Sequence, residues 1–194
     1  MHARTLLLAL LLLSAPSGAA LARPTAPPID DDQSARYQPG MTVIDQRGRR
    51  LRFYEDLIRG RVVLINFMFT TCTSICPPMT ANLAKVQRLL GARLAREVIM
   101  LSITVDPEVD TPEVLRRYAE RHGALPGWFF LTAPRDDLSA LLAKLGNTNL
   151  EKARHSGLLL LGNDATRTWT RMQAQAPPEE IASAVRQLLQ TRAR

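Results

Sequence analysis

Cysteine, histidine and lysine are scarce in this chain of 194 residues, and aromatic residues make up only 5% of it. The lysines are Lys85, Lys144 and Lys152, and the arginines are scattered rather than clustered. The chain therefore lacks the basic stripe with interleaved aromatics that marks a nucleic-acid site, and we expect no nucleic acid among its partners. The net charge of +7 instead indicates a mildly basic surface, or one that docks on an acidic partner or membrane face.

Hydrophobic runs long enough to span a membrane are also missing. His2 and Arg4 precede a Leu-rich run from Leu6 to Leu13, and small residues end at Ala22. This layout predicts a signal peptide over residues 1–22. The run is far shorter than the roughly 20 residues of a membrane-spanning helix, which favours a cleaved signal over an uncleaved anchor. We therefore expect an exported, periplasmic protein that meets the membrane only peripherally or through a partner.

The composition changes after the predicted signal. Residues 23–40 are rich in proline and contain the acidic run Asp30–Asp32, which predicts a flexible linker. The remainder, residues 41–194, is expected to form one folded domain. The hydrophobic and charged fractions of 46% and 22% are ordinary for a globular protein.

Strand and helix patterns alternate along the domain. Val62–Phe69 and Val98–Val105 are nearly unbroken apolar runs, which predict central strands covered on both faces. The sequence Asp110-Thr111-Pro112-Glu113 predicts a helix start, with Glu113 three residues after a capping Asp110. The remaining strand patterns predict an N-terminal β-hairpin from residues 41–43 and 51–53, a short strand over 128–131, and a second hairpin from 158–161 and 169–172. Three further helices are predicted around residues 83–90, 138–145 and 181–189. The order predicts an α/β fold, with a central mixed β-sheet flanked by helices on both faces.

The two cysteines, Cys72 and Cys76, lie where a predicted buried strand ends and a helix begins. Unpaired N–H groups at a helix N-terminus stabilise a thiolate and lower the pKa of a nearby thiol. If the helix includes both residues, their i, i+4 spacing puts the two sulfur atoms on one face. A structural disulfide is the alternative in an exported protein, although so short a loop would stabilise the fold little.

Two thiolates form a soft ligand set that suits Cu(I) or zinc and calls for a third ligand. His2 is lost with the signal peptide, and His122 is expected to end a helix. His155 precedes a predicted strand, but a single histidine is more often structural than a ligand, so both roles stay open. Zinc would require a fourth ligand, and none is evident. The methionines near these elements are expected to fill the core rather than bind metal; they are Met68, Met79 and Met100.

Three motifs resemble the Sco/SenC family of copper-binding proteins associated with cytochrome c oxidase assembly. The segment 67–77 resembles the family's strand followed by Cys-x-x-x-Cys-Pro, the segment 102–113 resembles its second signature, and His155-Ser156 resembles its distal histidine. The resemblance implies a thioredoxin-like fold and one copper ion, Cu(I) or Cu(II), bound by Cys72, Cys76 and His155. It also implies that the protein is a metallochaperone rather than an enzyme, and that it loads or reduces the copper site of cytochrome c oxidase. The implied partner is a subunit of that oxidase or another periplasmic copper or thiol-redox protein.

The alternative function is a thiol-disulfide oxidoreductase that cycles Cys72 and Cys76 against a partner's disulfide. The predicted fold and the placement of the thiols both permit this function. However, the spacing of the two cysteines is longer than the Cys-x-x-Cys of thioredoxin-type reductases. Arg154 precedes the histidine where many relatives carry an acidic residue, which could change the basicity of His155 or partner docking. Asp106 either lies near the site or caps a turn before Pro107.

Overall fold

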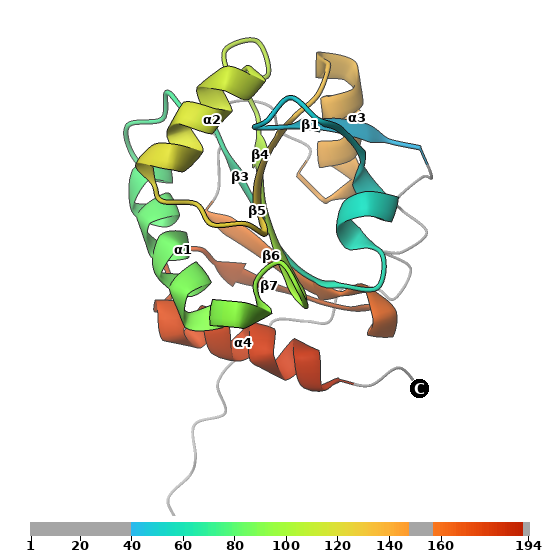
Figure 1. Ribbon diagram of the computed structural model, residues 1–194, viewed down its shortest axis with the longest axis vertical. Coiled ribbons are helices and arrows are strands. Elements are labelled where there is room, and N and C mark those ends of the chain that lie inside the picture. Colours follow the sequence, from blue (N-terminus) through green and yellow to red (C-terminus); the bar gives the residue numbers. More distant parts are fainter. Residues whose placement is uncertain (1–39, 148–156, 192–194) are drawn as a thin grey trace, which may run out of the picture.

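Figure 1 shows the computed structural model, which describes residues 40–147 and 157–191. The predicted signal peptide and nearly all of the predicted linker lie outside these residues, as do Arg154 and His155. None of the helices in the described ranges is long and apolar enough to cross a membrane.

A seven-stranded mixed sheet forms the centre of the fold, with the strand order β2-β1-β5-β4-β3-β6-β7. Strands β3, β4 and β5 run parallel, whereas the other neighbours pair antiparallel. The bounds are β1 Thr42–Asp45, β2 Arg50–Arg52, β3 Val62–Met68, β4 Val98–Thr104, β5 Trp128–Thr132, β6 Leu158–Asn163 and β7 Thr168–Gln173. The predicted mixed sheet, its N-terminal hairpin and its two buried central strands are confirmed.

The helices cover both faces of this sheet (Figure 1). Helices α1 (Cys76–Leu90) and α2 (Pro112–Arg121) connect successive parallel strands that step the same way across the sheet. Because such crossovers are right-handed, both helices lie on one face. Helix α4 (Pro178–Gln190) packs beside α1 on that face, and α3 (Arg135–Lys144) lies on the opposite face.

The core strands align the two loops that matter for the site. Every residue of β3 and of β4 is buried, and their register runs from Val62 beside Val98 to Met68 beside Thr104. The two strands therefore end at the same edge of the sheet. The cysteine loop follows β3 there, and the loop that leads to α2 follows β4.

Two local predictions were wrong or incomplete. The N-cap of α2 is Thr111, whose side chain accepts a hydrogen bond from the Val114 N–H at 3.4 Å, so Asp110 is not the cap. The Asp110 carboxylate accepts hydrogen bonds from Thr70 and Thr104 instead, as described below.

A six-residue π-helix, Phe53–Ile58, follows the hairpin and was not predicted. Its buried residues Phe53, Leu57 and Ile58 follow a spacing that could have indicated a helical turn.

Candidate functional site

The cysteine pair lies in the connection from β3 to α1. Cys76 is the first residue of α1, whereas Cys72 belongs to the turn before it, so the helix includes only one of the two cysteines. Both cysteines are free thiols, and their exposed fractions are 9% for Cys72 and 0% for Cys76. The predicted disulfide alternative is therefore not the state that the structure describes.

The start of α1 directs one hydrogen-bond donor at the Cys72 sulfur. The Cys76 N–H donates to Cys72 Sγ over 3.3 Å. The next two residues, Pro77 and Pro78, have no N–H group, and the Met79 N–H already donates to the carbonyl of Ile75. Among these first four positions of α1, Cys76 thus supplies the single N–H that faces the thiol.

The two thiols differ in acidity. Burial raises the pKa of Cys72, but hydrogen bonds from Cys76 and Ser74 outweigh it and bring that pKa below its ordinary value. Burial, followed by the hydrogen bond to Cys72, raises the pKa of Cys76 to about 12. Cys72 is therefore the more acidic thiol and the potential nucleophile of the pair, and Cys76 is the less acidic partner.

A buried carboxylate ties the cysteine loop to the neighbouring loop. Asp110 Oδ2 accepts hydrogen bonds from the Thr70 N–H at 3.1 Å and from Thr104 Oγ1 at 2.5 Å, and Asp110 Oδ1 accepts one from the Thr70 hydroxyl. The Asp110 side chain is fully buried. Burial raises its pKa, although the hydrogen bonds from both threonines oppose that shift. Asp110 thus connects the segment before Cys72 to the end of β4.

Two further residues surround this cluster. The Asp106 N–H donates to Thr104 Oγ1 over 2.9 Å, and the Asp106 carbonyl accepts from the Val109 and Asp110 N–H groups, which places Asp106 in the turn after β4. Its side chain is 5% exposed. The Tyr118 hydroxyl lies 2.9 Å from Thr80 Oγ1, and burial, together with the nearby thiols, raises the pKa of Tyr118. Thr70 lies in the motif segment 67–77, and Thr104 and Asp110 lie in the segment 102–113, but the sequence analysis gave none of them, nor Tyr118, a role at the site.

The structure leaves the predicted third ligand open. His155 lies outside the described residues, and within those residues no group of three His, Cys, Asp or Glu side chains is arranged to hold a metal ion. His122 is the C-cap of α2, as expected, and its ring lies 4.5 Å from that of Tyr118. The three methionines considered above are all fully buried in the core.

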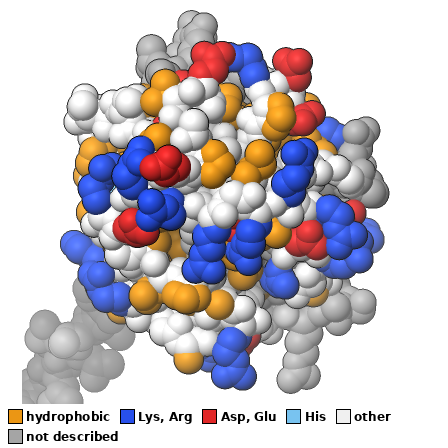
Figure 2. Space-filling view, turned by 45° about the horizontal axis from the view of Figure 1, so that its top comes forward, with side chains coloured by type: hydrophobic (Ala, Val, Ile, Leu, Met, Phe, Trp, Pro, Cys, Tyr) orange, Lys and Arg blue, Asp and Glu red, His pale blue; other side chains and the backbone are white. Residues whose placement is uncertain are grey.

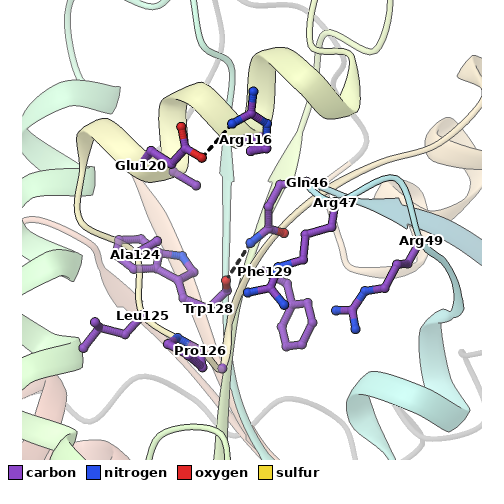
Figure 3. Close-up of a pocket in the computed structure, with 12 residues that line it drawn as sticks. Gln46, Arg47, Arg49, Arg116, Glu120, Ala124, Leu125, Pro126, Trp128 and Phe129 are labelled. Carbon is purple, nitrogen blue, oxygen red and sulfur yellow. Dashed lines mark hydrogen bonds and ion pairs between the residues drawn. The ribbon is translucent and has the colours of Figure 1, made fainter.

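Figure 3 shows a cleft of about 260 Å³. It is bounded by the β1–β2 turn, by α2 and by the segment that enters β5. Arg49 pairs with Asp45, and the Gln46 side chain bonds to the backbone of β5, with its Nε2 3.1 Å from the Trp128 carbonyl. No cysteine or histidine lines this cleft. The cysteines therefore lie outside the lining of this cleft.

Charged side chains are dispersed over the face shown in Figure 2, where Asp and Glu side chains lie among Lys and Arg. Several arginines pair with acidic residues four positions away in the sequence: Arg93 with Glu97, Arg116 with Glu120, and Arg117 with Glu113. This dispersal agrees with the scatter of arginines noted in the sequence.

A mixed sheet with a thiol pair at the turn from a central strand to a helix defines a thioredoxin-like protein. Residues 29–190 match the family model described as SCO1/SenC, and the chain belongs to that family.

Individual relatives agree with this assignment. A SCO1 protein homolog of Bacillus subtilis is 35% identical over 105 residues, which are 54% of this chain and 52% of the relative, so the match spans about half of that relative's length. The solved structure of BsSco, described as a Sco-family cytochrome c oxidase assembly protein with a disulfide switch, is 27% identical with a TM-score of 0.65, over 78% of this chain and 92% of that one. Bradyrhizobium japonicum ScoI with copper bound shares the fold, at 23% identity and a TM-score of 0.64, over 76% and 96% of the two chains.

Proposed function

We propose that this protein is an exported metallochaperone that captures copper with the thiolates of Cys72 and Cys76 and the imidazole of His155. The observation that carries the proposal is the 3.3 Å contact from the Cys76 N–H to Cys72 Sγ, which holds the two cysteines together at the end of β3. Two thiolates with an imidazole suit copper, because soft sulfur ligands favour Cu(I) and imidazole suits either oxidation state.

The path of the chain supports His155 as the third ligand. Strand β6 runs antiparallel to β3 with Leu159 beside Asn66, and continuing this register puts Gly157 beside Met68, the last residue of β3. The Gly157 carbonyl is anchored by the Ala174 N–H at 2.7 Å. In the sequence, His155 precedes Gly157 by two residues. The proposal therefore requires the His155 imidazole to reach the edge of the sheet at which β3 ends.

The site of action follows from the relatives and the predicted leader. Because a relative is described as a cytochrome c oxidase assembly protein, we propose that the chain loads or reduces the copper site of that oxidase outside the cytoplasm. In this role copper is cargo and the protein is a carrier rather than an enzyme. A related solved structure from Bacillus anthracis is described as a lipoprotein, which supports a location outside the cytoplasm.

Copper binding to the reduced protein tests this function directly. We expect stoichiometric copper by metal analysis, with a thiolate-to-copper absorption band that is lost or weakened in His155→Ala. The matched control is His122→Ala, which removes the histidine at the end of α2 and should leave the band unchanged. Failure of the reduced wild-type protein to retain copper would contradict the proposal.

The unequal acidity of the two thiols favours a second candidate, a thiol-disulfide oxidoreductase. The Cys72 thiolate would attack a partner's disulfide, form a mixed disulfide and release one partner sulfur as a thiolate. Cys76 would then lose its proton and attack the Cys72 sulfur, which releases the second partner sulfur and leaves a Cys72–Cys76 disulfide. The partner gains two electrons and the protein loses two. Rapid insulin reduction without copper would favour this function over the first.

A further inference from the structure

We propose that Asp110 is a positioning residue for the thiol pair, and that it acts by holding Thr70 and through it the loop that presents Cys72. The part of this proposal that concerns copper rests on the proposed function. The part that concerns the geometry of the two thiols does not.

The hydrogen bonds of Asp110 converge on the cysteine loop from outside it. Thr70 is two residues before Cys72 and donates to the Asp110 carboxylate through both its N–H and its hydroxyl. Thr104, the last residue of β4, donates to Oδ2 of the same carboxylate. Asp110 therefore fixes the loop after β3 against a strand that is buried along its whole length.

No local role accounts for this placement. The cap of α2 is provided by Thr111, so the helix that follows does not use the Asp110 side chain. Burying a carboxylate is costly unless it is hydrogen-bonded, and the donors that compensate it here come from Thr70 and Thr104. The stabilisation that this carboxylate provides is thus directed at the cysteine loop.

Loss of the Asp110 carboxylate should loosen the cysteine loop. The Thr70 N–H would lose its acceptor, and the backbone that leads to Cys72 would no longer be held against β4. Residues that orient metal ligands without contacting the metal typically lower the metal affinity by about 10–100-fold when they are removed. A looser loop also lowers the effective concentration of one thiol near the other, and this disfavours the disulfide.

The test uses the full chain and three variants. Asp110→Ala removes both carboxylate oxygens that accept hydrogen bonds from Thr70 and Thr104. Asp110→Asn keeps one carbonyl oxygen for Thr70 and places an N–H₂ donor toward the Thr104 hydroxyl, so it should restore the geometry. Asp45→Ala is the matched control, because Asp45 is another fully buried aspartate with several hydrogen bonds, but it lies in the β1–β2 turn.

The first readout is copper affinity with the thiolate-to-copper band. We expect affinity to fall about 10–100-fold in Asp110→Ala and to stay within about threefold of wild type in Asp110→Asn and in Asp45→Ala. Wild-type affinity and band position in Asp110→Ala would overturn the proposal. An equal loss in Asp45→Ala would also overturn it, because the effect would then come from general destabilisation.

The second readout needs no copper. Equilibration with glutathione converts the protein dithiol and glutathione disulfide into the protein disulfide and two glutathione thiols. The equilibrium constant should fall about tenfold in Asp110→Ala, which corresponds to about 30 mV, and recover in Asp110→Asn. A wild type that binds no copper would contradict the proposed function, while this equilibrium would still decide the role of Asp110.

A further variant covers the case in which Asp110→Ala does not fold. Thr70→Val removes only the hydroxyl donor and keeps the Thr70 N–H. It should change the glutathione equilibrium in the same direction by a smaller factor. An equilibrium identical to that of wild type would overturn the proposal.

Discussion

Two fully buried aspartates organise two loops of this protein in different ways. Asp45 accepts hydrogen bonds from within its own turn, from the Arg47 and Arg49 N–H groups at 2.9 Å, and pairs with the Arg49 guanidinium at 2.7 Å. Asp110 accepts from Thr70 and Thr104, which are 40 and 6 residues away. In the described part of the chain, no cationic side chain forms an ion pair with Asp110.

The difference separates a turn that stabilises itself from a loop that depends on the rest of the fold. The Asp45 turn can form from a short stretch of sequence, and its carboxylate is neutralised by a neighbouring arginine. The cysteine loop is completed only when β3 and β4 are paired in register. Its thiols therefore reach their positions with the folded core, next to a carboxylate without a neutralising cation in the described ranges.

The largest expected effect is the loss of copper binding when the cysteine loop, but not the Asp45 turn, is mutated. Cys72→Ser should abolish stoichiometric copper retention, since the loss of one thiolate leaves too few soft ligands. Arg47→Ala, in the Asp45 turn, should leave copper retention unchanged. Metal analysis of the reduced proteins after desalting measures both. If Cys72→Ser retained stoichiometric copper, the proposal that the copper site lies in the cysteine loop would be contradicted.

The second prediction concerns the acidity of the thiols in the cysteine loop. Because the pKa of Cys72 is lowered and that of Cys76 is raised to about 12, alkylation at neutral pH should label Cys72 at least about 100-fold faster. Labelling of Cys72 should persist below the ordinary thiol pKa of about 8.5. Mass spectrometry of the labelled peptides gives both rates. Equal rates would show that the two thiols are equivalent.

A third prediction concerns the stability of the Asp45 turn. Asp45→Ala leaves the N–H groups of Arg47 and Arg49 without their acceptor and should lower the free energy of unfolding by about 2–4 kcal/mol. Denaturant titration of the reduced, metal-free protein measures it. The comparison of the two loops predicts unchanged copper binding in this variant, and a parallel loss of copper would mean that the loops are coupled.

The smallest expected effect is a dependence of stability on pH that comes from Asp110. Its pKa is raised by burial, so the folded state binds the proton more tightly than the unfolded state. The free energy of unfolding should therefore decrease as pH rises from the unfolded-state pKa of about 4 through the higher folded-state pKa. Asp110→Asn should remove this slope. An unchanged slope in unfolding titrations across that range would assign it to other groups.

The sequence predicted those parts of the fold whose signals are local. Strands β3 and β4 are continuous apolar runs, and a strand covered on both faces requires such a run. The two cysteines were found for a similar reason, because a strand end followed by Cys-x-x-x-Cys-Pro is visible in one short segment.

Asp110 shows where local interpretation fails. Its spacing from Glu113 fits a capping box, yet the cap is Thr111 and the Asp110 carboxylate binds Thr70 and Thr104. Thr70 is distant in sequence and becomes a neighbour only through the register of β3 with β4. The predicted ligand role of His155 stays a prediction, since that residue lies outside the described ranges.

The pair of prolines after Cys76 has a consequence for spectroscopy. Because Pro77 and Pro78 have no amide proton, the Cys76 amide is the only backbone amide proton among the first three residues of α1, and it donates to the Cys72 sulfur. Its hydrogen-exchange rate and chemical shift should therefore depend on whether that sulfur is a thiolate, part of a disulfide or bound to metal. This single amide resonance would report the chemical state of the site in solution without any label on the cysteines.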